Sequence, residues 1–513
     1  MRFAALLITF CTLTVRCLAS GPNENRDEQR VDRLFAAYDK PGSPGCALGV
    51  IRNGDFVYRK GYGTASLELG VPLSSHSVFY MGSVSKQFTA AAVVLAAEQG
   101  FLSLDDNVRK YIPEVPDYGQ PITLRQMLHH TSGFRDVLGL LALSGRSAAD
   151  LHPTNELLDL VARQKALNFN PGEKSLYSNT NYFLLAEVVK RATCKPLSQF
   201  AAENIFKPLG MAHTRFYDDH TVVVPGRIPA YQPGKDGAFL VDWSTNFEKV
   251  GDGGLMSTVD DLLFWDRNFY ENKLGKGTLV QEMQTRGILN NGKRIGYALG
   301  LELGTYRGLP IVEHDGALFG YRTDILRFPE QKFTVVCLCN VASADPSGLA
   351  HKVADIYLEK SLQPAAELRS VNAISASSPA AASASSLAVF AGKYYDSDRH
   401  SLLPFTVVDG YLTVWGITLR PIAANRFEGT TGYEIVFAGS GNATKVTVSS
   451  DGTEMLSAAR IDDLHLNDAA LVAYTGVYAS PTGRHLQAVA RKGKAHAAHR
   501  LGCPGAADSA DHR

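Results

Sequence analysis

The stretch Met81-Gly82-Ser83-Val84-Ser85-Lys86 leads directly into an apolar segment, and the two together organise the first part of the chain. Alanine and other apolar residues recur at helical spacing after Lys86, and the pattern stops at Gly100. This pattern predicts a buried helix of about four turns that is capped by Gly100. Ser83 and Lys86 stand three positions apart, so a helix brings both side chains to one face.

A serine and a lysine at a helix start form a chemically competent pair. A serine hydroxyl becomes a nucleophile when a nearby base takes its proton. A lysine at the mouth of an apolar helix is partly desolvated, which lowers its pKa and suits it to that task. Because Ser-x-x-Lys also occurs by chance at ordinary helix starts, other parts of the chain have to support this interpretation.

The composition excludes a nucleic-acid partner. The chain has 513 residues, of which 45% are hydrophobic, and this suits two or more globular domains. Lysine and arginine together equal aspartate and glutamate, so the formal net charge is zero. A nucleic-acid-binding protein would show a basic excess.

The N-terminus is typical of an exported protein. Met1-Arg2 precedes an apolar run from Phe3 to Leu13, and small residues follow around Ala19. These features predict a signal peptide over residues 1–20 and a secreted or periplasmic protein. A membrane anchor is the alternative, but the run is short and Arg16 interrupts its end. We expect no membrane span after signal cleavage.

The cysteines and histidines form no recognisable metal-binding pattern. His129 and His130 lack a third ligand at a suitable spacing, so we expect both to pack in the core. The cysteines beyond the signal peptide follow no disulfide framework, and most are expected to be buried packing residues. They are Cys46, Cys194, Cys337, Cys339 and Cys503. We predict neither a metal nor an organic cofactor.

The pattern over residues 21–362 predicts one α+β domain. Strands at both ends of a helical middle favour an antiparallel sheet with helices on its faces and an inserted helical lobe. Asn53-Gly54 separates two apolar runs and predicts an early hairpin. Further helices are predicted at 123–130, 182–191, 259–270 and 350–362, and further strands at 297–303, 309–313, 321–328 and 333–338.

The chain changes character after residue 362. Residues 363–386 are rich in proline, alanine and serine and are predicted to form a linker. Short alternating runs over 387–491 predict a C-terminal all-β domain, either lipocalin-like or a small barrel. A weak repeat relates Leu387–Tyr394 to Leu471–Tyr478, and the second unit breaks off early. Residues 492–513 are predicted to be a disordered tail, for which a frameshifted end is a further hypothesis.

Two other stretches carry side chains suited to acyl transfer. The first is Tyr177-Ser178-Asn179, in which the Tyr177 phenol can transfer a proton if nearby cations lower its pKa. Asn179 is expected to form a hydrogen bond with Lys86 or with a substrate amide, or to cap a helix. The stretch His314-Asp315-Gly316-Ala317 follows a predicted strand, which offers a backbone N–H as an oxyanion donor.

The three motifs, taken in this order, resemble the serine β-lactamase and penicillin-binding-protein family. They match its Ser-x-x-Lys, its Tyr-x-Asn and the histidine variant of its Lys-Thr-Gly motif. The resemblance covers residues 30–360 and is strongest for the class C-like branch, which contains DD-carboxypeptidases, D-aminopeptidases and esterases. Other similar stretches are His130-Thr131-Ser132-Gly133, Pro208-Leu209-Gly210-Met211 and Gly253-Gly254-Leu255-Met256-Ser257-Thr258.

The resemblance implies a β-lactamase/transpeptidase-like fold and an acyl-enzyme mechanism. Ser83 is the implied nucleophile, and the general base is left open between Lys86 and Tyr177. The expected catalytic residues are Ser83, Lys86, Tyr177, Asn179 and His314. The expected oxyanion and substrate-binding residues are Ser83, Ala317, Gly316 and Asp315.

The third motif departs from Lys-Thr-Gly, which helps this family bind a substrate carboxylate. His314 is expected to be mostly neutral at pH 7, and an ionised Asp315 would repel an anion unless it turns away from the cleft. We therefore expect a hydrolase of esters, amides or D-amino-acid peptides, with a small-molecule, peptide or peptidoglycan-like substrate. The alternatives are a true β-lactamase or DD-carboxypeptidase and, in another class, a catalytically inactive peptidoglycan- or penicillin-binding sensor.

Overall fold

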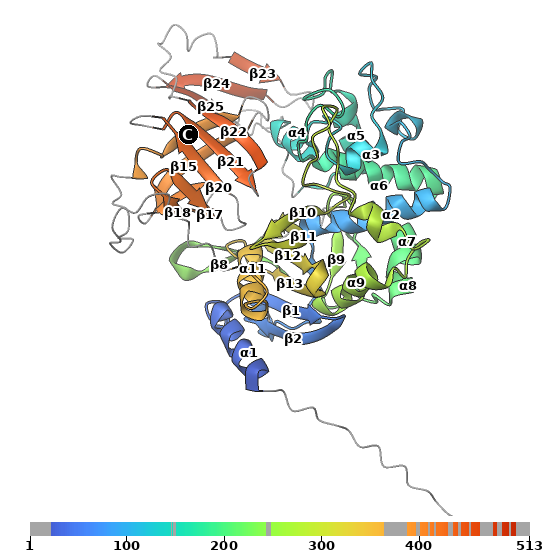
Figure 1. Ribbon diagram of the computed structural model, residues 1–513. Helices are drawn as coiled ribbons and strands as arrows, with labels where there is room; N and C mark the ends of the chain where they lie inside the picture. The colour runs from blue at the N-terminus through green and yellow to red at the C-terminus, as the bar shows by residue number, and fades with distance from the viewer. Residues whose placement is uncertain are drawn as a thin grey trace, which may run out of the picture.

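The computed structural model describes residues 22–144, 146, 150–242, 248–363, 387–396, 401–408, 411–414, 417–428, 434–439, 443–450, 453–461, 476–479, 485–491 and 494–498 (Figure 1). The predicted signal peptide, nearly all of the predicted linker and most of the predicted tail lie outside these residues. Within the described part of the chain, no helix has both the length and the apolar character needed to cross a membrane.

A six-stranded antiparallel sheet forms the centre of the first domain, in the order β10-β11-β12-β13-β1-β2. Its strands are β1 (Cys46–Arg52), β2 (Asp55–Tyr62), β10 (Glu302–Tyr306), β11 (Leu309–Leu318), β12 (Tyr321–Phe328) and β13 (Phe333–Cys339). The predicted hairpin is confirmed, because β1 and β2 pair across Asn53 and Gly54, whose φ angles are +53° and +81°. A tight hairpin turn requires such left-handed conformations.

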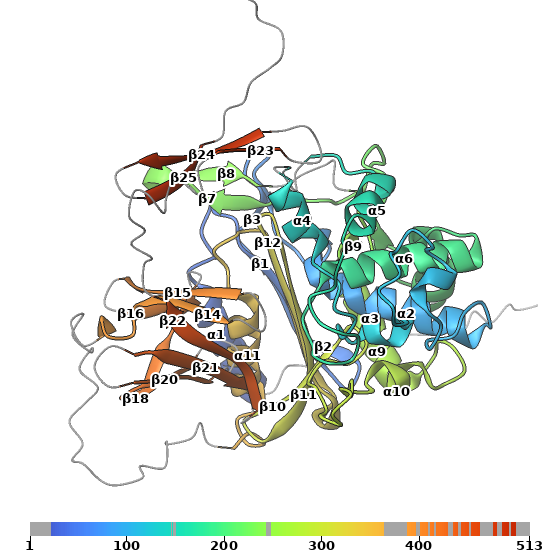
Figure 2. The ribbon, with the colours of Figure 1, turned by 90° about the horizontal axis from the view of Figure 1, so that it is seen from above.

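Both faces of the sheet are covered, and this explains why β13 is a continuous apolar run. Alternate residues of β13 enter two separate cores, with Val336 and Leu338 in one and Val335 and Cys337 in the other. Helix α2 (Ser85–Glu98) packs in the first core, while α1 (Pro22–Phe35) and α11 (Pro346–Tyr357) cover the second (Figure 2). The predicted antiparallel sheet between helices is thereby confirmed.

Helix α2 confirms the prediction made from the apolar segment. Every residue from Ser85 to Ala96 is buried, and Gly100 follows the helix end with a φ of +82°. Glycine adopts this conformation without the steric cost that a Cβ atom would add. The helix begins two residues later than Ser83, because Gly82–Val84 form a turn of 3₁₀-helix in front of it.

A helical lobe is inserted between the two groups of sheet strands. Its helices are α3 (Leu124–Leu128), α4 (Val137–Leu143), α5 (Thr154–Ala162), α6 (Asn179–Thr193), α7 (Leu197–Ala201), α8 (Lys207–Leu209), α9 (Val259–Glu271) and α10 (Leu279–Met283). Short strands link the lobe to the sheet: β3 (Thr64–Ser66), β4 (Val71–Pro72), β5 (Phe79–Tyr80), β6 (Arg215–Phe216), β7 (Tyr231–Pro233), β8 (Phe239–Val241) and β9 (Leu255–Ser257).

The largest differences from the predicted bounds occur in three elements. The strand expected to end at residue 313 continues to Leu318, because its polar second half pairs with β12 through the backbone. The strand expected at 297–303 is β10, which starts at Glu302. Helix α11 starts and ends earlier than predicted, because Asp345 accepts a hydrogen bond from the Gly348 N–H and Pro346 begins the helix.

Three of the four described cysteines are buried, as expected, but two of these also form a disulfide that the sequence spacing did not predict. Cys46 and Cys339 are register partners on β1 and β13 and form a disulfide. Cys337 is a buried free thiol, and Cys194 is an exposed one. Sequence spacing gave no sign of this pairing, because the two half-cystines are separated by 293 positions and meet only through the sheet.

The C-terminal domain is all-β, as predicted, and its larger sheet has the order β17-β16-β15-β14-β22-β21-β20-β19-β18. These strands are β14 (Gly392–Asp396), β15 (Ser401–Val408), β16 (Tyr411–Val414), β17 (Ile417–Thr418), β18 (Arg420–Ala423), β19 (Arg426–Glu428), β20 (Glu434–Ala438), β21 (Lys445–Ser450) and β22 (Thr453–Ile461). A second sheet contains β23 (Gly476–Ala479), β24 (His485–Arg491) and β25 (Lys494–Ala498).

The weak sequence repeat corresponds to repeated strands. Strands β23 and β24 begin 84 residues after β14 and β15, since 476 − 392 and 485 − 401 both equal 84, and each pair is antiparallel. The prediction of a disordered tail from residue 492 was wrong for Lys494–Ala498, which pair with β24 as β25. A strand of this kind is held by backbone hydrogen bonds and does not need apolar alternation.

Candidate active site

Ser83 lies at the junction between the sheet and α2. It is the middle residue of the 3₁₀ turn, and its side chain is partly exposed. Gly82 has a φ of +52°, and a Cβ atom there would come within 2.7 Å of the Ala317 nitrogen on β11. Glycine at this position therefore lets the turn pack directly against the strand that carries the third motif.

Lys86 lies behind Ser83 and is completely buried. Its Nζ atom donates hydrogen bonds to Ser83 Oγ at 3.0 Å, Asn179 Oδ1 at 3.0 Å and the Asp252 carbonyl oxygen at 2.6 Å. Burial lowers the pKa of Lys86 to about 7; the carboxylate of Asp252 opposes the shift, while the ammonium of Lys249 adds to it. A large fraction of Lys86 is therefore a neutral amine at neutral pH.

Tyr177 faces both residues from the loop before α6. The Lys86 Nζ atom lies 4.7 Å from the centre of the Tyr177 ring, and the Tyr177 phenol interacts with the Ser83 side chain. The side chain is 40% exposed, so it also borders solvent. The condition for Tyr177 to take a proton, a pKa lowered by nearby cations, is not met: desolvation of the phenol raises the pKa of Tyr177 well above its ordinary value, and its interaction with Ser83 only partly opposes this.

Asn179 forms a hydrogen bond with Lys86, which was one of the roles predicted for it. It is the first residue of α6, and its side chain contacts Lys86 instead of capping the helix. Asp136 Oδ2 fixes it by accepting hydrogen bonds from the Asn179 backbone N–H at 2.6 Å and from Nδ2 at 2.9 Å. Sequence reasoning missed Asp136, which lies 43 positions before Asn179 and outside the stretches that the sequence analysis singled out.

His314 lies beside this group but is buried and fully hydrogen-bonded. Its Nδ1 atom is 2.7 Å from the Asp315 carbonyl oxygen, so Nδ1 carries the proton and Nε2 accepts from the Tyr297 hydroxyl at 3.0 Å. Burial, followed by the nearby charge of Lys86, lowers the pKa of His314 to about 3. The prediction of a neutral His314 is confirmed. Tyr297 was missed, because it stood in a region predicted to be a strand.

Gly316 and Ala317 bring a second backbone N–H to the nucleophile. A Cβ atom on Gly316 would lie 2.3 Å from the Met81 carbonyl oxygen and 3.0 Å from the Ser83 nitrogen. The backbone of β11 therefore touches the turn that carries Ser83, and the N–H groups of Ser83 and Ala317 stand at this contact. Two adjacent N–H groups of this kind suit an oxyanion at an attacked carbonyl.

Asp315 is exposed, and it lies on the opposite face of β11 from His314. It is the register partner of Asp324, whereas His314 is the partner of Ile325 in the α2-side core. Neighbouring strand residues alternate between faces, so the carboxylate and the imidazole point apart. The site consequently presents no cation at the position where this motif usually carries lysine.

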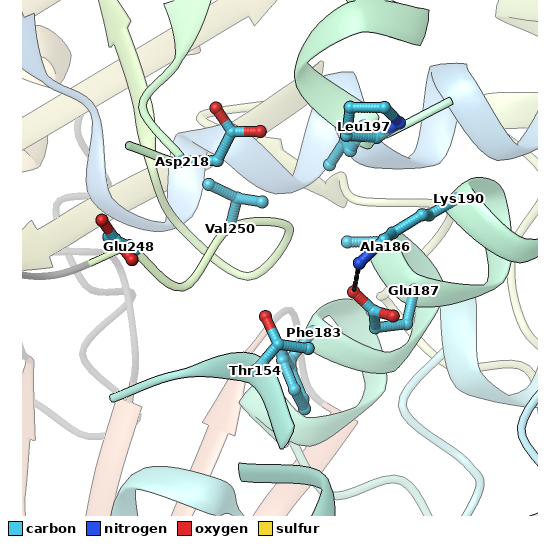
Figure 3. A pocket seen from close by; sticks show the side chains of 10 residues that line it. Thr154, Phe183, Ala186, Glu187, Lys190, Leu197, Asp218, Glu248 and Val250 are labelled. Carbon is cyan, nitrogen blue, oxygen red and sulfur yellow. Dashed lines mark hydrogen bonds and ion pairs between the residues drawn. The ribbon is translucent and has the colours of Figure 1, made fainter. Parts of the chain in front are cut away.

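The described residues give little support for a metal at this site. His129 and His130 are both buried, as expected. Two side-chain groups have the spacing of metal ligands, but one includes the disulfide cysteines, and the other, Asp219 with His220 and Glu248, contains no residue of the three motifs. A cavity of about 140 Å³ next to α6 is lined partly by Glu248 but by no residue of the three motifs (Figure 3).

The fold and the arrangement of Ser83, Lys86 and Tyr177 are those of a β-lactamase-like protein. A family model described as Beta-lactamase matches residues 31–358, which is more than half of the chain. The protein therefore belongs to the β-lactamase family.

Two curated relatives illustrate the sequence similarity. Penicillin-binding protein 4* of Bacillus subtilis (strain 168) is 30% identical over 303 residues, which are 56% of this chain and 66% of that protein. A D-aminopeptidase of Gluconobacter oxydans (strain 621H) is 28% identical over 326 residues, which are 62% of this chain and 59% of that protein. The chain thus matches about three fifths of the length of these relatives.

Solved structures share the fold at lower sequence identity. The octameric penicillin-binding protein homologue from Pyrococcus abyssi has a TM-score of 0.59 at 24% identity, covering 84% of this chain and 99% of that one. A D-amino acid amidase from Ochrobactrum anthropi SV3 has a TM-score of 0.54 at 20% identity, covering 65% and 98%.

Proposed function

We propose that the protein is a secreted serine hydrolase that forms an acyl-enzyme on Ser83 and cleaves amides or esters, including D-amino-acid derivatives. The observation that carries this proposal is the 3.0 Å contact between Ser83 Oγ and the buried Lys86 Nζ, which also lies 4.7 Å from the centre of the Tyr177 ring. A nucleophile and a base in hydrogen-bond reach, with the base oriented by a third group, are the requirements for covalent acyl transfer.

Acylation begins when Ser83 Oγ bonds to the substrate carbonyl carbon and its proton passes to the neutral amine of Lys86. The carbonyl oxygen becomes an oxyanion, which the N–H groups of Ser83 and Ala317 stabilise, each by a few kcal/mol. The bond to the leaving group then breaks. The leaving atom takes a proton from the Tyr177 hydroxyl, and Tyr177 regains a proton from the Lys86 ammonium.

Deacylation repeats these steps with water as the nucleophile. Lys86, again a neutral amine, takes a proton from water as the oxygen of water bonds to the acyl carbon. The bond between that carbon and Ser83 Oγ then breaks, and the proton on Lys86 returns to Ser83. The raised pKa of Tyr177 and the lowered pKa of Lys86 favour Lys86 as the base.

The third motif favours a substrate without a carboxylate beside the scissile bond. Neither His314, which is uncharged at neutral pH, nor the acidic Asp315 supplies a cation there. The curated relative named D-aminopeptidase and the structural neighbour named D-amino acid amidase support amides of D-amino acids as the first compounds to test.

Three chromogenic substrates test the proposal. Steady-state rates on D-alanine p-nitroanilide, p-nitrophenyl butyrate and nitrocefin are compared for the wild type and Ser83→Ala. We expect turnover of the anilide or the ester that disappears in the variant. Faster turnover of nitrocefin would favour a β-lactamase, and Ser83 labelling by a fluorescent penicillin without any turnover would favour a binding sensor.

Export is part of the same proposal. The predicted signal peptide supports it, and the Cys46–Cys339 disulfide is of the kind that persists in oxidising compartments. Expression with its own N-terminus in a bacterial host, followed by intact-mass analysis of the periplasmic and medium fractions, tests it. Cleavage near Ala19 is expected, and an uncleaved cytoplasmic product would contradict export.

A further inference from the structure

His130 accepts hydrogen bonds from the residues immediately before and after Tyr177. The His130 carbonyl oxygen accepts a hydrogen bond from the Leu176 N–H at 2.9 Å, and its Nδ1 atom accepts one from the Ser178 N–H at 3.2 Å. The residues immediately before and after Tyr177 are therefore attached to one histidine, which lies 47 positions earlier in the chain (177 − 130 = 47).

The imidazole of His130 also supports the Tyr177 ring itself. The two ring centres are 4.4 Å apart, and the His130 ring lies 4.6 Å from the Tyr297 ring. Asn181 Nδ2 lies 3.1 Å from the same Nδ1 atom, which confirms Nδ1 as an acceptor and leaves the ring proton on Nε2. Only 1% of His130 is exposed, and burial lowers its pKa well below the ordinary value, so the acceptor persists over the working pH range.

The backbone around His130 is fixed as well. Its φ angle is +57°, a left-handed conformation that non-glycine residues seldom adopt. The loop that follows is pinned by hydrogen bonds from the Gly172 N–H to the Thr131 carbonyl and from Ser132 Oγ to Asn181 Oδ1, at 2.8 and 2.5 Å. The histidine is therefore held by groups on both sides of the Tyr177 loop.

We propose that His130 is a positioning residue that keeps the Tyr177 hydroxyl on Ser83 and on the leaving group. This inference rests on the proposed function, because it assigns Tyr177 the proton that the leaving group takes. The leaving nitrogen of an amide must be protonated, whereas the leaving group of an activated ester need not be. The rate of amide cleavage therefore depends on His130 more than the rate of ester cleavage does.

Two substitutions separate the contributions of the imidazole. His130→Phe keeps a ring against Tyr177 and removes the acceptor for the Ser178 N–H. His130→Asn keeps an acceptor near the position of Nδ1 and suits the left-handed backbone. The matched control is His351→Phe, because His351 is also buried, has a ring centre 4.4 Å from that of Tyr306 and has Nδ1 on the Ser347 carbonyl, but lies in the α11-side core.

The kinetic test compares kcat/KM for D-alanine p-nitroanilide and p-nitrophenyl acetate, with enzyme concentration set by fluorophosphonate labelling of Ser83 so that misfolded protein is not counted. The anilide-to-ester ratio is expected to fall by about 10-fold or more in His130→Phe and to recover in His130→Asn. It should not change in His351→Phe. A ratio in His130→Phe within about 2-fold of the wild type would overturn the inference.

A structural measurement keeps this test separate from the proposed function. Crystal structures of His130→Phe and His130→Asn report whether the Tyr177 hydroxyl still contacts Ser83 Oγ. Loss of the contact in His130→Phe with retention in His130→Asn supports the inference, and retention in both overturns it. If the wild type neither turns over these substrates nor reacts at Ser83, the proposed function has failed, and the two crystal structures still decide the role of His130.

Discussion

The Nζ atom of Lys86 lies 3.0 Å from Ser83 Oγ, and the Lys86 side chain is fully buried. Because burial lowers the pKa of Lys86 to about 7, the base form is reached as the pH rises through neutrality. We therefore predict that kcat/KM on an activated ester is low at acid pH, rises with an apparent pKa of about 7 and then levels off. A pH–rate profile checks this, and a profile that is flat from pH 5 to pH 9 would contradict it.

The substitution Lys86→Arg tests whether the residue at this contact has to lose its proton to act as the base. A guanidinium stays protonated at all working pH values, so it cannot take the proton of Ser83. We expect kcat/KM to fall by about 100-fold or more without recovery at high pH. Lys190→Arg is the control, because Lys190 is half-exposed on α6 and pairs with Glu187, and it should retain wild-type activity.

Gly316→Ala is predicted to abolish activity by separating β11 from the nucleophile turn. The added Cβ atom would lie 2.3 Å from the Met81 carbonyl oxygen and 2.4 Å from Thr323 Oγ1, so the strand has to move. Gly139→Ala is the matched control, since nothing lies within 4 Å of a Cβ atom at that position of α4. Equal labelling of Ser83 by a fluorophosphonate in both variants would contradict this prediction.

Much of this site was predictable because its residues lie in short local patterns. Ser83 and Lys86 share a helical face, and Tyr177 and Asn179 flank the start of α6, so each spacing had a structural meaning. Asp136 and Tyr297 were not predictable, because they reach the site through loops with no periodic pattern. Loop conformation depends on tertiary contacts more than on local propensity.

The disulfide is predicted to stabilise the central sheet. It joins two neighbouring strands, β1 and β13, whose half-cystines are separated by 293 positions in the sequence. Removing such a link restores conformational freedom to the unfolded chain, and we expect the Cys46→Ala, Cys339→Ala double variant to lose about 2–5 kcal/mol of unfolding free energy. Denaturant unfolding measures this, with Cys337→Ala as the control. A double variant as stable as the control would show that the disulfide contributes nothing.

The sequence could not reveal this disulfide, nor could it reveal the buried carboxyl groups of the sheet. Asp324 and Glu313 stand in the neighbouring strands β12 and β11, and their proximity follows only from the strand register. Strand pairing depends on the whole sheet, whereas alternation within one strand is visible locally. The same reason explains why β10 and β11 were predicted with the wrong ends.

The free energy of unfolding is predicted to fall as the pH rises, because of the buried carboxyl group of Asp324. It is fully buried, and burial, followed by the charge of Glu313, raises its pKa well above the ordinary value. A carboxyl with a raised folded-state pKa stabilises the fold at low pH and loses that contribution as the pH rises through the folded-state pKa. We expect the melting temperature of the wild type to fall as the pH rises from 5 to 9, and Asp324→Asn to show a smaller fall. Equal slopes for the two proteins would contradict this.

The central claim is that Ser83 is the residue that becomes acylated. Intact-mass spectrometry of the protein, mixed with p-nitrophenyl butyrate and quenched in acid within seconds, tests it most directly. We predict a mass increase equal to one butyryl group, mapped by peptide analysis to Ser83 and absent in Ser83→Ala. Hydrolysis of the ester by Ser83→Ala at the wild-type rate, or an acyl group on another residue, would contradict the account.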